Sequence, residues 1–365
     1  MTPLGQLLIE RIREAGPITV AEYMAECLLH PVHGYYTTRD PFGADGDFTT
    51  APEISQMFGE LVGLALAQAW VDQGAPSPFT LAELGPGRGT LMADILRATR
   101  SVPGFHAGAR VVLVEASPLL RQMQAATLSG KVSGKVSGGP AEIGLAPVWL
   151  DRAEDLPDQP LFLVANEFLD ALPIRQFLLS PDGWRERLVG LADGALAFGL
   201  SAPLPQVPDT PAFRHASPGD LVEHCALAQG VVAASLRPIL RHGGLAIYID
   251  YGGWRSRGDT LQALRAHASD APLAHPGQAD LTAHVDFEPL ATLAPAHAYA
   301  PQGAFLHRLG IDARADRLAR NLTGPALESH LAALHRLTHP KEMGSLFKVL
   351  ALTRAASPLP PGFAP

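Results

Sequence analysis

Short hydrophobic runs alternate along the chain with longer stretches in which hydrophobic residues recur every three or four positions. The clearest runs cover residues 79–84, 110–116, 161–168 and 245–250, and they are nearly continuous in hydrophobic residues. Strands that are buried on both faces of a parallel sheet have this composition. Because helical patterns separate the runs, we expect an α/β fold with a doubly wound sheet.

Helical and turn-rich segments surround this alternation. The N-terminal residues fit an amphipathic helix, and Thr19 with Glu22 has the spacing of a capping box at the start of a second helix. Residues 184–200 predict a hairpin that turns at Asp193-Gly194.

The order of these elements predicts two parts. An N-terminal helical and lid segment occupies residues 1–78, and the α/β domain occupies residues 79–365. The domain is expected to carry insertions at about residues 173–215 and 254–345, the second of them helical. A last strand is expected at residues 347–355.

Composition and charge narrow the classes of function. Hydrophobic residues make up 47% of the 365 residues and charged residues 18%, which allows a sizeable core and excludes a disordered chain. The net charge is −8, from 28 Lys and Arg against 36 Asp and Glu, so nucleic acid is not the expected partner. No stretch fits a membrane-spanning helix. The two cysteines, Cys27 and Cys225, form no CxxC pair, and we expect both to be reduced.

A glycine-rich turn follows the first strand, in the string LAELGPGRGTL at residues 81–91. Its glycines have a GxGxG spacing, whereas a dinucleotide fingerprint needs GxGxxG and would have glycine where Thr90 stands. Glu83 lies two residues ahead of the first glycine, and an acid there would repel a pyrophosphate but suits the cationic end of S-adenosyl-L-methionine (SAM). The residues of this turn that we expect to contact SAM are Glu83, Gly85, Pro86, Gly87, Gly89 and Thr90.

Acids at the ends of later strands complete the predicted cofactor site. Glu115, followed by Ala116, ends the second strand, where a carboxylate can accept hydrogen bonds from both ribose hydroxyls. Asp151 follows the third strand and could accept from the adenine amino group, although a helix-capping or loop acid explains it equally well. With the helix that ends at Gly243-Gly244 before a buried strand, these elements predict a class I SAM-dependent methyltransferase fold with a Rossmann-like sheet.

Several longer strings resemble the MidA family of SAM-dependent methyltransferases. They include GDFTTAPEIS at residues 46–55, ANEFLDALPI at 165–174 and ADLTAHVDF at 279–287, and the resemblance covers nearly the whole chain. That family includes a mitochondrial protein arginine methyltransferase that assists assembly of respiratory complex I. The resemblance implies symmetric dimethylation of an arginine on a complex I subunit or its bacterial homologue. Since no transit peptide is evident, we expect a bacterial, cytoplasmic protein.

If the methyl acceptor is arginine, carboxylates must hold its guanidinium and take up a proton, because the free group has a pKa above about 12. Asn166 and Glu167 close the fourth strand, where the methyl group would lie, and Asp170 follows. The alternative is structural, with Asn166 capping a helix that starts at Glu167. His284 is a further candidate that could take up the released proton, although a buried histidine with ordinary hydrogen-bond partners is the commoner case.

Two structural expectations concern the stretch GDFTTAPEIS. Thr50 and Glu53 have capping-box spacing. The residues before the cap are not explained in this way, so we expect the segment to fold over the strand ends as a lid. Phe48 and Thr49 would shield the cofactor, and the helix N-terminus at Ala51 would lie near the methionine end of SAM.

Two histidines, His335 and His339, have the spacing of a helical metal pair. No third ligand is evident and methyl transfer needs no metal, so we expect no metal site. Two other functions also fit the sequence. A small-molecule methyltransferase would have a closed, mostly apolar pocket beside SAM, and an assembly chaperone would hold SAM without turnover.

Overall fold

The computed structural model describes residues 1–38, 50–129 and 145–364, which form two compact units. The large unit contains the described residues of 49–168, 231–251 and 291–365, and the small unit contains those of 1–48, 169–230 and 252–290. This division differs from the boundary that we expected at residue 78, since both units take up helices that precede it. Local sequence patterns do not reveal such a division, because each unit is assembled from three separate stretches of chain.

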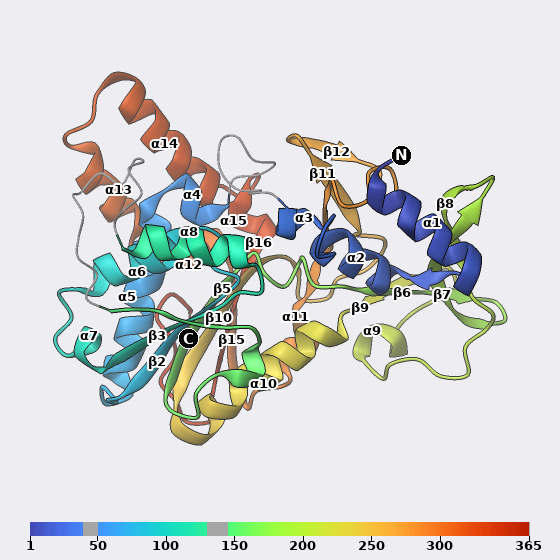
Figure 1. Cartoon of the computed structure of the whole chain (residues 1–365). Helices are drawn as coiled ribbons and strands as arrows, with labels where there is room; N and C mark the ends of the chain where they lie inside the picture. Colours follow the sequence, from blue (N-terminus) through green and yellow to red (C-terminus); the bar gives the residue numbers. More distant parts are fainter. Residues whose placement is uncertain (39–49, 130–144, 365) are drawn as a thin grey trace. The chain divides into compact units, whose positions relative to one another are not determined.

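The central sheet of the large unit has the strand order β15-β16-β10-β5-β2-β3-β4 (Figure 1). Its strands are β2 (Phe79–Leu84), β3 (Ala109–Val114), β4 (Val148–Leu150), β5 (Leu161–Asn166), β10 (Gly244–Gly253), β15 (Ala296–Pro301) and β16 (Phe347–Thr353). The strands from β10 to β4 are parallel, and β16 and β15 extend the β10 edge in antiparallel pairing. The chain adds β3 and β4 on one side of β2, then β5 and β10 on the other. The order therefore reverses between β2 and β5, and doubly wound sheets bind ligands beyond the carboxyl ends of the strands at such a reversal.

The four hydrophobic runs all form strands of this sheet, as predicted. Every residue of β2 and β5 is buried, which explains why their sequences do not alternate between polar and apolar residues. The last predicted strand is also confirmed, as β16. Trp70, Phe79, Phe105 and Phe162 pack in one aromatic cluster at the amino ends of these strands, with ring centroids 5.0–5.6 Å apart for the contacting pairs.

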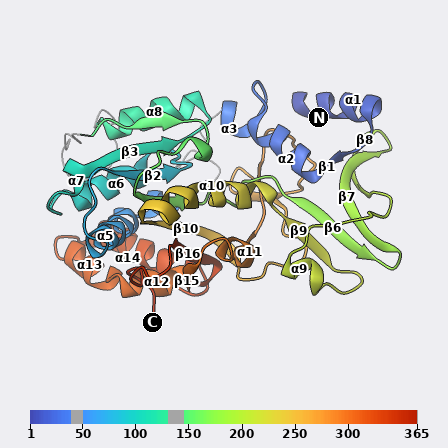
Figure 2. The same cartoon turned by 90° about the horizontal axis from the view of Figure 1, so that it is seen from below.

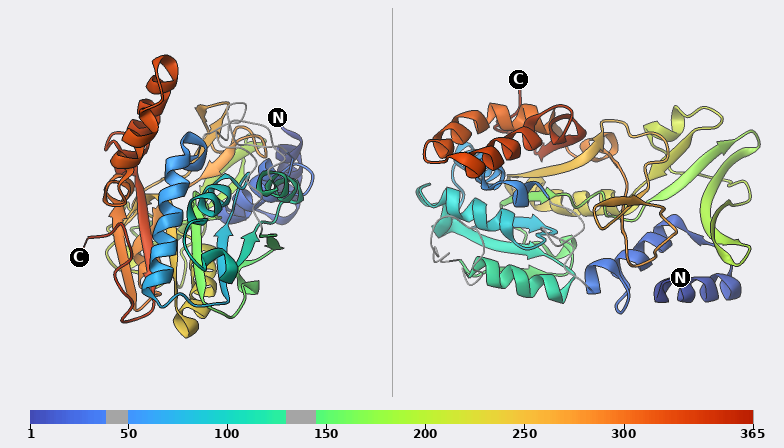
Figure 3. Two further views of the ribbon diagram at one scale, coloured as in Figure 1. Left: turned by 90° about the vertical axis from the view of Figure 1, so that its left-hand side faces the viewer. Right: turned by 90° about the horizontal axis from the view of Figure 1, so that it is seen from above.

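Helices flank the sheet of the large unit (Figure 2). They are α4 (Ala51–Ile54), α5 (Gln56–Asp72), α6 (Thr90–Thr99), α7 (Phe105–Gly108), α8 (Pro118–Leu128), α12 (Gln302–Arg308), α13 (Ile311–Ala319), α14 (Gly324–Thr338) and α15 (Met343–Leu346), with a 3₁₀ turn at Ala153–Asp155. Helix α14 extends away from the sheet (Figure 3). Helices α5 and α6 approach closely at Gly63, where a Cβ atom would lie 2.8 Å from the Cα of Ile95.

The small unit is built around an antiparallel sheet in the order β1-β7-β6-β9, with β8 paired to β7. Its strands and helices are β1 (Ile18–Thr19), β6 (Arg175–Ser180), β7 (Gly183–Ala192), β8 (Ala195–Leu200), β9 (Leu221–His224), α1 (Pro3–Ala15), α2 (Val20–Leu29), α3 (Tyr35–Thr38) and α9 (Pro211–Arg214). The predicted hairpin is confirmed, since β7 and β8 pair through a turn at Asp193 and Gly194. The capping box of Thr19 and Glu22 is confirmed at the start of α2.

The insertion predicted as helical at 254–345 contains strands as well. A three-stranded antiparallel sheet forms from β11 (Gln262–Arg265), β12 (Ala268–Asp270) and β13 (Asp280–Thr282). The short strand β14 (Val285–Asp286) then pairs with the end of β10 and leads into α11 (Phe287–Ala291). The prediction was wrong for these residues because the strands are too short to show a clear period of two. Helix α10 (Ala226–His242), β10 and α11 have residues in both units.

None of the helices within the described ranges combines the length and the hydrophobicity that crossing a bilayer requires.

A buried carboxylate joins three helices of the large unit, and its removal is expected to destabilise that unit. Glu60 in α5 is 4% exposed, and its carboxylate bonds Arg97 of α6 at 2.5 Å and Arg314 of α13 at 2.6 and 2.9 Å. Replacing it by alanine leaves two guanidinium groups without their shared partner. The Glu60→Ala variant should lose about 3–5 kcal/mol of unfolding free energy, measured by denaturant titration.

The matched control is Asp158→Asn, which removes an ion pair with Arg241 in which both side chains are more than half exposed. That variant should lose much less stability than Glu60→Ala, because solvent screens an exposed ion pair. Equal losses in the two variants would contradict the role given to Glu60.

Candidate functional site

The glycine-rich turn connects the end of β2 with the start of α6. Gly85, Gly87 and Gly89 have φ values of 61°, 54° and 81°, all in the left-handed region. At Gly85 there is also no room for a side chain, because a Cβ atom would lie 2.6 Å from the Phe168 ring. The turn lies where the strand order reverses, at the position where the GxGxG spacing predicted a cofactor, and its contacts with SAM stay a prediction.

Glu83 lies in β2 just before this turn, and its side chain is almost completely buried. The residue is 2% exposed and accepts a hydrogen bond from the backbone of Met92, in the first turns of α6. Its other oxygen, Oε2, has no hydrogen-bond partner among the described residues. Burial, together with the nearby charge of Glu115, raises the pKa of Glu83 to about 8. A buried acid without a counterion fits a cationic ligand.

Asn166 ends the neighbouring strand β5 and presents a second acceptor of this kind. It is 8% exposed, and within the described ranges its Oδ1 atom has no partner. Native proteins seldom leave buried polar atoms unpaired. An ammonium group has three N–H bonds to donate and could satisfy acceptors such as Glu83 and Asn166. The acceptor oxygens at the ends of β2 and β5 thus fit the ammonium group at the amino-acid end of SAM.

Glu115 follows the neighbouring strand β3, where the ribose contact was predicted. Its carboxylate accepts from the amide of Ser117 at 2.8 Å and from Nε2 of Gln124 at 3.2 Å. Burial raises the pKa of Glu115. Gln124 also donates to the Gly87 carbonyl at 2.8 Å and accepts from Nε1 of Trp149 at 2.8 Å. The side chain of Gln124 therefore joins the glycine turn to the predicted ribose acceptor.

Sequence reasoning missed Gln124. Gln124 is 0% exposed in helix α8. A polar residue at a position expected to be buried would have been the signal for it. Ala116, predicted beside Glu115, is exposed. Asp151 follows β4 but forms an ion pair with Arg121, and its side chain is 78% exposed. This contact fits the loop-acid alternative, and the adenine contact of Asp151 stays a prediction.

Glu167 comes directly after β5, and its conformation is unusual. Its φ value is 51°, in the left-handed region that a glutamate seldom adopts. The amide N of Ala51 and Nδ2 of Asn166 both donate to the same oxygen, Oε1, at 2.9 and 3.0 Å. Burial raises the pKa of Glu167, against the lowering effect of these two donors and of the charge of Arg336. One oxygen is thereby fixed by two donors, and neither of these bonds uses Oε2.

The structural alternative for Asn166 is wrong, because no helix starts at Glu167. Residues 167–172 form turns instead, and the Glu167 amide donates to the carbonyl of Ile249 in β10 at 2.9 Å. Asp250, a residue that sequence reasoning missed, is 1% exposed and accepts from the Phe168 amide at 3.1 Å. The turn that carries Glu167 is thus held from the neighbouring strand.

Asp170 and His284, the other catalytic candidates, belong to the small unit. Asp170 is 6% exposed, and its carbonyl accepts from the Ala283 amide at 3.0 Å. The amide of His284 donates to the Thr260 hydroxyl at 2.8 Å. His284 and Asp286 line a solvent-open hollow of about 550 Å³, and burial raises the pKa of Asp286 to about 6. A catalytic part for Asp170 and His284 stays a prediction.

The segment before α5 differs from its prediction. Phe48 and Thr49, expected to shield the cofactor, lie outside the described residues. The capping box expected at Thr50 and Glu53 is wrong, since the Thr50 side chain makes no cap hydrogen bond. The Glu53 carboxylate accepts instead from the hydroxyl of Thr90 at 2.6 Å. The first N–H of α4 is donated to Glu167 rather than left open for a ligand.

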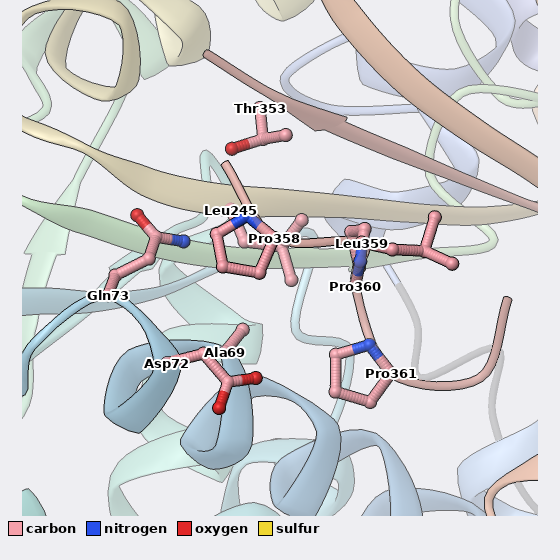
Figure 4. Close-up of a pocket in the computed structure, with 9 residues that line it drawn as sticks. All are labelled: Ala69, Asp72, Gln73, Leu245, Thr353, Pro358, Leu359, Pro360 and Pro361. Carbon is pink, nitrogen blue, oxygen red and sulfur yellow. The ribbon is translucent and has the colours of Figure 1, made fainter. Parts of the chain in front are cut away.

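Other places in the described ranges show no comparable chemistry. No group of three or more His, Cys, Asp or Glu side chains there is placed to hold a metal ion, and the rings of His335 and His339 stack 4.2 Å apart. A small hollow in the large unit is lined by α5 residues such as Asp72 and by the prolines at 358, 360 and 361 (Figure 4). It lies near Leu245 at the amino end of β10, the wrong edge of the sheet for a ligand.

Comparison with known proteins gives three kinds of match. A family model described as "Putative S-adenosyl-L-methionine-dependent methyltransferase" matches residues 61–304. The Drosophila melanogaster protein arginine methyltransferase NDUFAF7 homolog, mitochondrial, is 38% identical over 96% of this chain and 84% of its own length. The Homo sapiens protein arginine methyltransferase NDUFAF7, mitochondrial, is 37% identical over 96% of this chain and 83% of its own length.

Among solved structures, a Burkholderia thailandensis protein crystallised with S-adenosyl-homocysteine has the same fold. It matches with a TM-score of 0.82 and 29% sequence identity, over 99% of this chain and 94% of that chain. The names of the sequence relatives place those proteins in mitochondria, which speaks against the cytoplasmic location expected from the sequence.

Proposed function

The chain belongs to the family of SAM-dependent methyltransferases that its sequence resembled, and we propose that it methylates an arginine side chain of a protein substrate. The predicted methyltransferase fold, enzyme class and cofactor SAM are confirmed by the family match and by the solved relative. The arginine specificity is named in the relatives, and for this chain it is a proposal.

The observation that carries the proposal is the placement of Glu167. Its carboxylate lies at the carboxyl end of β5, next to the strand whose end holds the glycine turn. It is positioned by two hydrogen bonds to one oxygen and by a left-handed backbone conformation. Strained, over-determined residues of this kind cluster at functional sites. A fixed carboxylate at this edge suits a guanidinium, whose N–H groups form strong charge-assisted hydrogen bonds with carboxylates.

We assign the following roles to residues of the chain. Glu83 and Asn166 hold the ammonium end of SAM, the glycine turn lets the cofactor approach the backbone, and Glu115 holds the ribose. Bound SAM supplies a methyl group on a sulfonium sulfur. Glu167 orients the guanidinium so that one nitrogen faces this methyl group, and it accepts the proton that the nitrogen loses. Its raised pKa makes Glu167 a better proton acceptor than a free glutamate.

Finer features of the reaction are proposed from the resemblance to the MidA family. We propose that the product is symmetric dimethylarginine and that the substrate is a subunit of respiratory complex I or its bacterial homologue. The net charge of −8 is compatible with an arginine-bearing partner.

The test is to incubate the purified protein with SAM carrying a labelled methyl group and with the complex I subunit homologue, and to map the label by mass spectrometry. Label on an arginine is the expected result. Label on a lysine would overturn the arginine specificity. Tight SAM binding without any transfer would instead favour a chaperone that holds SAM without turnover.

A further inference from the structure

Glu53 has the sequence spacing of a helix capping box with Thr50, but this capping box does not form. Its backbone N–H bonds the Thr50 carbonyl at 2.9 Å, as in any first helical turn, but its carboxylate turns elsewhere. Oε1 accepts from the hydroxyl of Thr90 at 2.6 Å, across 37 residues of sequence. Thr90 is the first residue of α6 and directly follows the last glycine of the cofactor turn. Glu53 therefore ties α4 to the cofactor turn.

The other contact of α4 leads to Glu167. Ala51, two residues before Glu53 in the same helical turn, donates its amide N–H to Glu167 Oε1 at 2.9 Å. The turn between these two residues is short and stiff, because Pro52 is buried in it and the Ile54 amide bonds the Thr50 carbonyl at 3.1 Å. A displacement of Thr90 would therefore also displace the Ala51 amide, which donates to the Glu167 carboxylate.

We infer that Glu53 is a positioning residue that couples cofactor binding at the glycine turn to the orientation of Glu167. The expected effect on kcat rests on the proposed function. The coupling itself involves only the cofactor-binding turn and α4, and it needs no methyl acceptor. When SAM orders the turn, Thr90 is held in place, and α4 then holds the Glu167 carboxylate in one position. Coupling between two sites is reciprocal in binding free energy. A well-fixed Glu167 therefore also favours the SAM-bound arrangement of the turn.

The coupling can be tested without a substrate, by amide hydrogen exchange of peptides that cover residues 50–57. Adding SAM to the wild-type protein should slow exchange of these amides about tenfold, since the α4 contacts open less often. In Glu53→Ala this slowing should be lost, although SAM still binds. Glu53→Gln keeps an oxygen acceptor for the Thr90 hydroxyl and should restore it. Equal slowing in Glu53→Ala, or none in the wild type, would overturn the inference.

Kinetics with an arginine-bearing substrate give the second readout. Glu53→Ala should lower kcat about tenfold, because a small misplacement of Glu167 slows the chemical step. Since the coupling is reciprocal, the variant should also weaken SAM binding by up to about tenfold, so kcat is compared at saturating SAM. Thr90→Val should cause the same loss in kcat, and the double variant should be no worse than either single variant. Additive losses would overturn the inference, since they would mean that the two residues act independently.

The structural control is Ser55→Ala. This variant removes the hydrogen bond from the Met57 amide to the Ser55 side chain, at 3.2 Å, but leaves both α4 contacts in place. It should lower the unfolding temperature without changing the SAM-induced slowing or kcat. If the wild type shows the slowing but labels no arginine, the proposed substrate is wrong and the coupling stands. If it labels arginine but Glu53→Ala behaves as wild type, the coupling is wrong and the proposed function stands.

Discussion

Replacing Glu167 by glutamine is expected to lower kcat for arginine methylation by about 10²–10⁴-fold, the usual contribution of a positioned acid–base group. The amide keeps the size of the side chain and an oxygen for the Ala51 N–H. It loses the charge that holds the guanidinium and the site that accepts a proton. SAM affinity should stay within about threefold of the wild type, because the cofactor contacts lie on other residues.

The pH dependence gives an independent check on the same residue. An acid with a raised pKa is ionised only above that pKa, so wild-type kcat/KM should fall as the pH decreases through it. The Glu167→Gln variant should lack this decline in its residual rate. Glu154→Gln, the same substitution at an exposed position of the large unit, is the matched control and should keep the wild-type rate and profile. A Glu167→Gln variant with the wild-type kcat would remove Glu167 from the mechanism.

The second large effect concerns the amino-acid end of the cofactor. Glu83→Gln should weaken SAM binding about 10–100-fold, the range expected when a charged hydrogen bond of about 1.5–3 kcal/mol is lost. Binding of methylthioadenosine, a nucleoside without the amino-acid group, should change little. Calorimetry with both ligands separates the two contributions.

Proton release should accompany this binding. Since the pKa of Glu83 is raised to about 8, the side chain is largely protonated at pH 7, and an ammonium group favours its ionised form. SAM binding should therefore release more protons from the wild type than from Glu83→Gln, as measured in buffers with different ionisation enthalpies.

Glu115→Gln is the companion variant and should weaken binding of both SAM and methylthioadenosine, because each carries a ribose. Equal losses of both ligands in Glu83→Gln would contradict the ammonium contact.

The sequence predicted the parallel sheet well because each strand is recognisable from its own residues. Strands β2 and β5 are buried along their whole length, so their hydrophobic runs needed no information about neighbours. The glycine turn was equally local, since its three left-handed positions require glycine. Cofactor chemistry could therefore be inferred from residues that lie close together in the sequence.

Features that depend on distant contacts could not be predicted in this way. Glu53 has the spacing of a local cap, but its partner Thr90 is 37 residues away. Gln124 and Asp250 act by holding other residues, and a single polar side chain in a hydrophobic run does not reveal its partner. The sequence placed the boundary between two parts at residue 78, and the different assignment of residues could not be predicted for the same reason, since three separate stretches form each unit.

The proposed mechanism depends above all on where the substrate guanidinium lies relative to Glu167. The most direct measurement is a crystal structure of the full chain with S-adenosyl-homocysteine and an arginine-containing substrate peptide. We expect the ammonium of the bound product near Glu83 Oε2 and Asn166 Oδ1, and the guanidinium within about 3 Å of the Glu167 carboxylate. A guanidinium bound away from Glu167, with another side chain facing the sulfur, would contradict the proposed role of Glu167.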